Sequence, residues 1–438
     1  MSSFDTKSLV ALAIFTATYG VLAFRNVKGW KFPIWLILLI GAAAMVASGS
    51  ISVGDAYKAV DLHVILFLFS MFTLVTALDI AGVLDAFTTK LMLRAKKPED
   101  VLYLTFFGFA AASAILMNDT LALMGTPVMI SLAKKMKISS KPLLLTLAFA
   151  VTIGSTLTPM GNPQNLLVAL ASGMQAPVLT FAKYLLVPTI INLLLTYCLL
   201  TRFFGREFAK ARKNFRELID FEATVQKDIL KDTRLAKLAM SITVLTIVGI
   251  FLVNFLEEAG VAMPFGIAEV SLFGAVVLLA FCGRSREVIQ SIDWGILVLF
   301  ASLFVLTQAV WNNGIIAAFA SYLPAISVVN PHAYIAAILV PSVLLSQVLS
   351  NVPMVALYIP LLKSLSFGPQ NIPAWIALGA GSTLAGNLTL LGAASTLIIV
   401  EQAEKEGQTV GFFDFLKVGV LVTIVTVAVL YFSLILGI

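Results

Sequence analysis

Hydrophobic residues run along most of this chain in long stretches, and short polar or charged segments separate one stretch from the next. A helix needs roughly 20 apolar residues to cross the hydrocarbon core of a bilayer, so such stretches predict membrane spans. We expect ten spans, at 8–25, 33–50, 61–80, 142–172, 183–204, 237–257, 267–283, 293–312, 373–400 and 412–437. The pattern therefore predicts an all-α polytopic membrane protein.

Polar residues interrupt two further apolar stretches, about 101–133 and 331–362, near their middles. The first stretch contains Asn118-Asp119-Thr120, and the second contains Ser350-Asn351-Val352-Pro353. We expect each stretch to form a re-entrant hairpin, which enters the membrane and returns to the side from which it came.

The same pattern of spans and interruptions occurs twice along the chain. Equivalent positions are 231 or 232 residues apart: Asp61 and Asp293, Asn118 and Ser350, and Gly161 and Gly392. We expect a first repeat at 1–205, a charged cytoplasmic linker at 206–236 and a second repeat at 237–438. Five crossings per half is an odd number, so the two halves must insert in opposite orientations and form inverted-topology repeats.

Composition excludes a soluble globular protein, because 60% of the residues are hydrophobic and only 12% are charged. The net charge of +6 does not indicate a nucleic-acid partner, since the basic residues follow the predicted topology. Of the 29 Lys and Arg residues, the expected cytoplasmic segments hold all but Lys7, Lys58, Lys183 and Lys363. We expect a multi-pass protein in the lipid bilayer of a prokaryotic plasma membrane, with both termini outside.

Four polar interruptions carry the candidate chemistry: the two hairpin tips, and two breaks in spans at about 154–165 and 386–396. Non-helical backbone persists at membrane depth only where protein, water or a bound ion satisfies it. Amide ends of broken helices attract anions, whereas carbonyl ends and neutral side-chain oxygens suit sodium or a proton. We expect the ion and solute to bind at Asn118, Asp119, Thr120, Thr158, Gly161, Asn162, Asn165, Ser350, Asn351, Asn387, Thr389, Gly392, Ser395 and Thr396.

Asp119 is the sharpest single candidate, because a carboxylate within the membrane is costly to maintain. It could carry a proton, pair with a cation, or cap the second helix of its hairpin. Asp61 and Asp293 begin equivalent spans, and we expect both to cap them. His63 has no His, Cys or carboxylate partner at ligand spacing, so no transition-metal site is expected there, although the hairpin tips are candidate sodium sites.

Familiar enzyme motifs are missing from the sequence, which contains no Walker lysine motif, no HExxH and no GxSxG. We therefore expect no enzymatic activity and no cofactor other than a coupling ion, H⁺ or Na⁺. The repeats predict a secondary active transporter for a small inorganic or organic anion. An ion channel is the alternative from another functional class.

The motifs named above, over nearly the whole chain, resemble those of the ion transporter superfamily. This group contains arsenite permeases, NhaD-type sodium/proton antiporters, citrate transporters and divalent anion/sodium symporters. In its symporters, paired Ser-Asn-Thr motifs at the hairpin tips bind sodium and substrate. Here Asn118-Asp119-Thr120 replaces the first triplet and Val352 replaces the last threonine of the second.

The resemblance implies a homodimer in which a transport domain, carrying both hairpins, moves like an elevator against a scaffold. The first hairpin tip is more similar to the arsenite-permease and NhaD branch, which implies exchange with protons. A sodium/proton antiporter and an arsenite efflux permease are therefore the alternatives within transport.

Overall fold

The computed structural model describes residues 6–24, 33–83, 86–87, 90, 94–210, 232–315 and 330–437. Helices joined by short connections make up these ranges, and no strand occurs within them. The all-α architecture is thus confirmed. Most of the charged linker expected at 206–236 lies outside the described residues.

The first half of the chain contains nine α-helices in the described ranges and one short 3₁₀ turn. They are α1 (Thr6–Phe24), α2 (Ile34–Ala47), α3 (Val53–Ala59), α4 (Leu62–Ile80), α6 (Pro98–Ser113), α7 (Asn118–Met136), α8 (Lys141–Gly154), η1 (Ser155–Leu157), α9 (Pro163–Ser172) and α10 (Pro177–Lys210). The span expected at 142–172 is therefore broken, as its glycines and prolines predict.

The second half follows the same order. Its described helices are α12 (Thr233–Glu258), α13 (Ile267–Phe281), α14 (Ser285–Ser291), α15 (Trp294–Asn312), α17 (Pro331–Leu349), α18 (Asn351–Ser364), α19 (Ile372–Ala385), α20 (Ala394–Lys405) and α21 (Phe412–Leu436). Both α3 and α4 recur as α14 and α15 with starts and ends 232 residues later. The helices thus repeat with the spacing of the sequence pattern.

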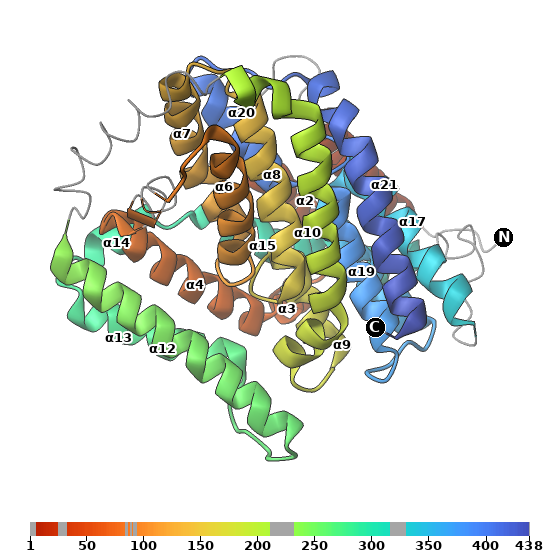
Figure 1. Cartoon of the computed structure of the whole chain (residues 1–438). Coiled ribbons are helices and arrows are strands. Elements are labelled where there is room, and N and C mark those ends of the chain that lie inside the picture. Colours follow the sequence, from red (N-terminus) through yellow and green to blue (C-terminus); the bar gives the residue numbers. More distant parts are fainter. Residues whose placement is uncertain are drawn as a thin grey trace.

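Contacts between the halves are reciprocal. Helix α2 packs on α15, and the equivalent pair, α13 and α4, also pack together. Likewise α7 packs on α20, and α18 on α9. In Figure 1, α10 and α21 lie side by side and run in opposite directions, while α4, α12 and α13 form one side of the molecule. Each of these contacts from the first half to the second thus has an equivalent contact from the second half to the first, as a two-fold relation between the halves would produce. The opposite orientation of the halves in the membrane stays a prediction.

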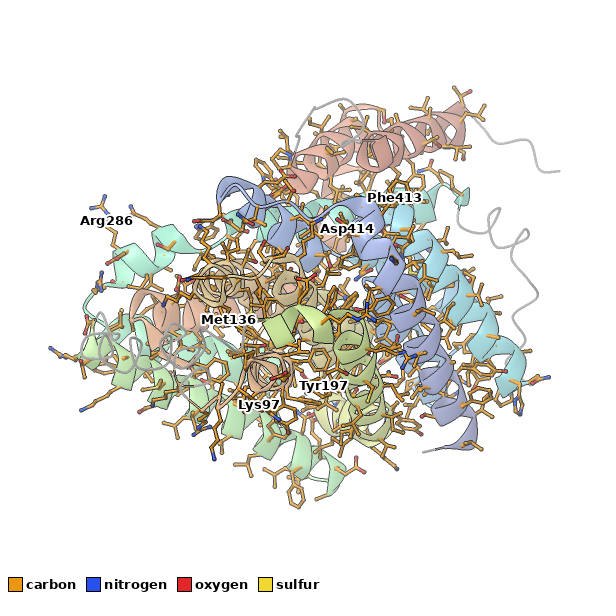
Figure 2. The ribbon with its side chains drawn as sticks, turned by 45° about the horizontal axis from the view of Figure 1, so that its top comes forward. Lys97, Met136, Tyr197, Arg286, Phe413 and Asp414 are labelled. Atoms are coloured by element: carbon orange, nitrogen blue, oxygen red, sulfur yellow. The ribbon has the colours of Figure 1, made fainter. Side chains whose placement is uncertain are left out.

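Six described helices are long and apolar enough to cross a membrane: α4, α10, α12, α15, α17 and α21. Shorter apolar helices coincide with other expected spans, such as α1, α2, α8, α13 and α19. Charged side chains gather at helix ends: Figure 2 shows Arg286 of α14 pointing away from the body, and Asp414 at the start of α21. One of the six long helices, α17, is the first helix of the second predicted hairpin and is long enough to cross the membrane. Re-entry of that hairpin therefore stays a prediction.

Both predicted hairpins consist of two helices, but their connections differ from the expected interruptions. In the first, Asn118, Asp119 and Thr120 form the opening turn of α7, and residues 114–117 make the connection. Polar and acidic side chains suit a first turn, where backbone N–H groups lack helical partners. In the second hairpin a single residue, Ser350, separates α17 from α18.

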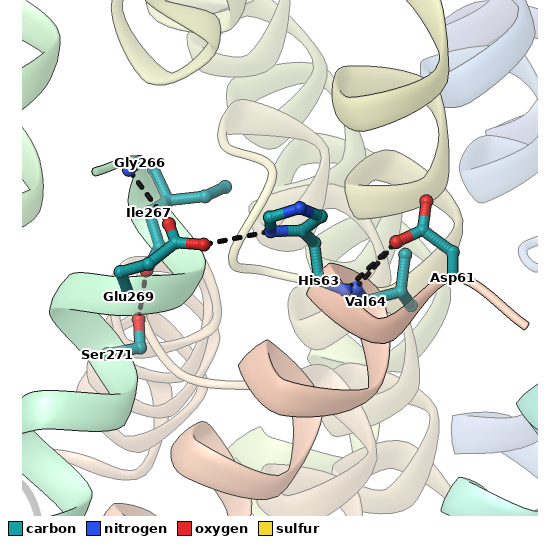
Figure 3. Close-up of polar contacts among 7 residues, drawn as sticks. All are labelled: Asp61, His63, Val64, Gly266, Ile267, Glu269 and Ser271. Atoms are coloured by element: carbon teal, nitrogen blue, oxygen red, sulfur yellow. Dashed lines mark hydrogen bonds and ion pairs between the residues drawn. The ribbon is translucent and has the colours of Figure 1, made fainter. Parts of the chain in front are cut away.

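Of the two predicted caps, one is confirmed. The Asp61 carboxylate accepts hydrogen bonds from the backbone N–H of His63 and Val64, at 2.9 and 3.3 Å (Figure 3). The prediction for Asp293 is wrong, because its side chain accepts no capping bond from α15.

His63 also has a carboxylate partner that lies far from it in the sequence. Its Nδ1 is 2.9 Å from Oε1 of Glu269, whose other oxygen accepts a bond from the Gly266 N–H (Figure 3). This pair joins α4 of one half to α13 of the other, at helix ends that the topology predicts on the same side.

Close backbone packing positions the first break. A Cβ on Gly154 would lie 2.1 Å from the carbonyl oxygen of Ala110, so α8 approaches α6 more closely than any side chain permits. Only glycine avoids this clash.

We therefore expect Gly154→Ala to lower the stability of the purified protein by at least ~2 kcal/mol, because backbone must move to admit the methyl group. The matched control is Gly205→Ala, since nothing lies within 4 Å of a Cβ there. The control should change the thermal denaturation midpoint little or raise it slightly. Equal midpoints for the two variants would contradict this packing.

Candidate functional site

The tip of the first hairpin is hydrogen-bonded to the first break. The backbone N–H of Asn118 donates to the carbonyl of Gly161 at 2.9 Å. The Thr158 hydroxyl donates to the carbonyl of Ala114, just beyond α6. The connection of the hairpin and the non-helical part of the span, residues 158–162, are thereby held together.

Two asparagines satisfy the backbone of the first break. The Asn162 side-chain amide donates to the carbonyl of Ser155 at 2.9 Å. The Asn165 amide lies 3.1–3.2 Å from the carbonyls of Ser155, Thr156 and Thr158. Asn165 is fully buried and Asn162 is 1% exposed, so these amides replace the missing helical hydrogen bonds without solvent.

The second break is built differently. Ala393 and Thr396 occupy the positions of Asn162 and Asn165, so the two amides have no counterpart. Instead, Gln347 of α17 reaches the break: its amide donates to the carbonyl of Ala385 at 2.9 Å, and its oxygen accepts from the Thr389 hydroxyl at 2.7 Å. The duplicated unit thus supports its two breaks with different chemistry.

Repeat-equivalent glycines allow both breaks to close on themselves. A Cβ on Gly161 would lie 2.5 Å from the Ser155 carbonyl oxygen, and one on Gly392 would lie 2.7 Å from that of Ala385. Both predicted glycines therefore shape the site through their small size.

Side chains from the two halves meet across the site. Nδ2 of Asn118 is 3.4 Å from the Ser395 hydroxyl in the first turn of α20. Gln164 in the first turn of α9 donates to the Thr383 hydroxyl of α19 at 3.0 Å. That hydroxyl also lies 3.2 Å from Oδ1 of Asn165. The site therefore forms one connected region between the repeats.

Several buried polar atoms here have no hydrogen-bond partner among the described residues. They are Oδ1 of Asn118, Oδ1 of Asn351, both side-chain polar atoms of Asn387, and the Thr396 hydroxyl. Leaving such a group unsatisfied costs about 1–3 kcal/mol, so a cluster of them indicates a place where an ion, water or solute binds. All four residues belong to the predicted tips and breaks.

Asp119 is 7% exposed and forms no ion pair with any described residue. The residue preceding α7 is Met117, so Asp119 lies inside the first turn and is not the cap. The positive end of the helix dipole favours a negative charge there. Thr120 beside it is half-buried.

Sequence reasoning missed Gln347 and Thr383, whereas Gln164 lies within the break predicted at 154–165 without being one of the named candidates. Gln347 was detectable as an amide within an apolar helix. Thr383 lies in the glycine-rich segment 379–386, where the bonds of its hydroxyl to Gln164 and Asn165 give it a structural role.

Comparison with known proteins decides the family. The family model described as citrate transporter matches residues 10–379, which is most of the chain. The chain belongs to the citrate transporter family. It is a membrane transporter, and the resemblance to the ion transporter superfamily is confirmed.

Relatives of this citrate transporter family member extend over nearly its whole length. An uncharacterized transporter of Mycobacterium bovis is 29% identical, covering 96% of each chain. A transporter named arsB in Dictyostelium discoideum is 24% identical, covering 89% of this chain and 85% of that protein. A silicon efflux transporter of Oryza sativa subsp. japonica is 26% identical, covering 84% of each.

The fold is also similar to a solved structure, the YdaH transporter of Alcanivorax borkumensis. The TM-score is 0.56 over 98% of each chain, with 14% sequence identity. This likeness supports the all-helical architecture described here for the chain.

Asn165→Leu should destabilise the protein by roughly 3 kcal/mol, because it leaves buried carbonyls of the first break unpaired. Its repeat-equivalent, Thr396→Val, removes a hydroxyl that bonds to no described residue, so it should not lower stability. Thermal denaturation of both purified variants checks the contrast. A loss in Thr396→Val as large as in Asn165→Leu would refute the different roles of the two breaks.

Proposed function

We propose that the chain is a secondary active transporter that moves a small anion, coupled to a proton or sodium gradient. The observation that carries this proposal is the set of hydrogen bonds that joins the two hairpins to the two breaks, together with the buried polar atoms there that have no partner among the described residues. A buried site between repeats is suited to opening to either side of the membrane in turn.

Helix ends give the site its preference for ions. Four helices begin at the tips or breaks: α7 at Asn118, α9 at Pro163, α18 at Asn351 and α20 at Ala394. Their N-terminal amides carry partial positive charge and favour an anionic solute. The helices that end there, α6, α8, α17 and α19, present carbonyl oxygens that suit a cation.

The side chains favour a small solute of low charge. The tips and breaks contain no Lys or Arg, and Asp119 is their one carboxylate. A multiply charged carboxylate would lack a fixed positive partner, whereas a singly charged oxyanion needs only amides and hydroxyls. The names of the relatives, arsB and silicon efflux transporter, support a second candidate, efflux of a small neutral hydroxide such as arsenite or silicic acid.

Asp119 is the proposed carrier of the coupling ion. Burial without an ion pair to any described residue makes its charged form costly, so binding of a proton or Na⁺ would accompany entry of the solute. A sodium/proton antiporter would use the same carboxylate without an anion. In either case the hairpins and breaks would move together as a transport domain, elevator-like, within a homodimer.

Purified protein in liposomes tests this proposal, with arsenite, silicic acid, phosphate, sulfate, citrate and succinate supplied under imposed pH or sodium gradients. We expect gradient-driven flux of one solute, reduced at least tenfold in Asp119→Asn and no longer dependent on the gradient. The control is Asp55→Asn, an exposed acid in the first turn of α3, which should transport normally.

Proton flux driven by Na⁺ or Li⁺ without any solute would move the assignment to the antiporter. Unchanged flux in Asp119→Asn would remove Asp119 from the coupling mechanism.

A further inference from the structure

Gln347 makes a fully satisfied set of hydrogen bonds between the second hairpin and the second break. One N–H of its amide donates to the Val343 carbonyl in its own helix at 2.8 Å, and the other to the Ala385 carbonyl at 2.9 Å. Its oxygen accepts from the Thr389 hydroxyl at 2.7 Å. A flipped amide would place its oxygen against two carbonyls, so the network fixes its orientation.

The bond to Thr389 extends into the turn of the break. The Thr389 hydroxyl, which donates to Gln347, accepts from the backbone N–H of Leu391 at 3.2 Å. Gly392 allows this approach, because a Cβ there would lie 2.8 Å from Oε1 of Gln347. Gln347 therefore braces the turn that follows Asn387, whose side chain has no hydrogen-bond partner among the described residues.

The first hairpin has no equivalent clasp. The residue 232 positions before Gln347 is Ile115, which cannot form such bonds. Three bonds hold that hairpin instead: the Asn118 N–H donates to the Gly161 carbonyl, and the hydroxyls of Thr158 and Ser113 donate to the carbonyls of Ala114 and Val151. Among the described residues, Gln347 makes both hydrogen bonds between α17 and the second break.

Backbone strain marks the same place. Ser350, the one residue between α17 and α18, has φ +69° and ψ 162°, a conformation that favours glycine. The four-residue connection of the first hairpin contains no positive φ. On its outer side, Leu349 packs against Tyr19 and Ile37 through apolar contacts, which impose little direction. The second hairpin packs on α19, but its tip is strained and, among the described residues, its hydrogen bonds to the break come from one side chain.

We propose that Gln347 is a positioning residue that clasps the second hairpin over the second break, and that its release opens this hairpin to admit the solute. The proposal rests on the transport function proposed above and assigns the opening movement to one of the two hairpins. Rotation of one side-chain amide breaks both bonds to the break at once. The first hairpin stays fixed by its separate bonds to the first break and to α8.

Thiol accessibility tests the clasp without requiring a known solute. In a background with Cys198→Ala and Cys282→Ala, a single cysteine is placed by Val352→Cys at the start of α18, or by Thr120→Cys at the repeat-equivalent position in α7. The protein in liposomes is then treated with a water-soluble maleimide. Gln347→Met, which keeps the length of the side chain without its hydrogen bonds, should raise the reaction rate at position 352 by about tenfold. The rate at position 120 should change less than about twofold.

Thr389→Val provides a milder second variant, because it removes one bond to Gln347 and leaves the bond to Ala385. It should raise the rate at position 352 by a smaller factor, and adding it to Gln347→Met should have no further effect. An unchanged rate at position 352, or an equal rise at both positions, would overturn the proposal.

The proposed function and the clasp fail in different ways. If no solute is transported but the accessibility pattern holds, the transport proposal fails and the clasp stands. If transport occurs and the pattern is missing, the clasp fails alone. Where a solute is found, Gln347→Met should raise its KM more than it lowers its kcat, whereas general destabilisation would lower the amount of active protein with KM unchanged.

Discussion

Within a membrane, every backbone amide and carbonyl must find a partner, because lipid offers none. The two hairpin tips and the two breaks depart from helix within apolar parts of the described chain, so each must be satisfied by side chains, by neighbouring backbone or by something bound. Asn162 and Asn165 satisfy the first break almost completely. The second break leaves Asn387 and Thr396 unpartnered among the described residues. The location of the proposed site follows from this difference.

Duplication followed by divergence explains how one architecture acquires an asymmetric site. The helices recur in the same order, α3 and α4 at a spacing of 232 residues, and glycines at equivalent positions, Gly161 and Gly392, keep both breaks compact. The side chains at equivalent positions differ: Asp119 corresponds to the uncharged Asn351, and Gln347 corresponds to Ile115. A carrier needs both similarity and difference between its halves. Similar halves allow access from either side of the membrane, and different side chains allow the ion and the solute to occupy different positions in one site.

Much of this organisation was predictable from sequence, because spans, breaks and repeats depend on hydrophobic periodicity and on glycine and proline. The expected spans coincide with helices, and candidates such as Asn118 and Ser395 do meet. Contacts between distant segments were not predictable, since they depend on how helices pack: Glu269 beside His63, Thr383 beside Asn165, and Gln347 on the break. The cap expected at Asp293 failed because repetition of a residue does not guarantee repetition of its local geometry.

Binding calorimetry on the purified protein tests the central claim most directly, that solute and coupling ion bind together at the tips and breaks. The transported solute is titrated with and without Na⁺ and at two pH values, using the natural protein and Asn387→Leu. The account predicts that affinity rises severalfold when the coupling ion is present, and that binding is lost in Asn387→Leu while the protein stays folded. Equal affinity with and without ions, or normal binding in Asn387→Leu, would contradict it.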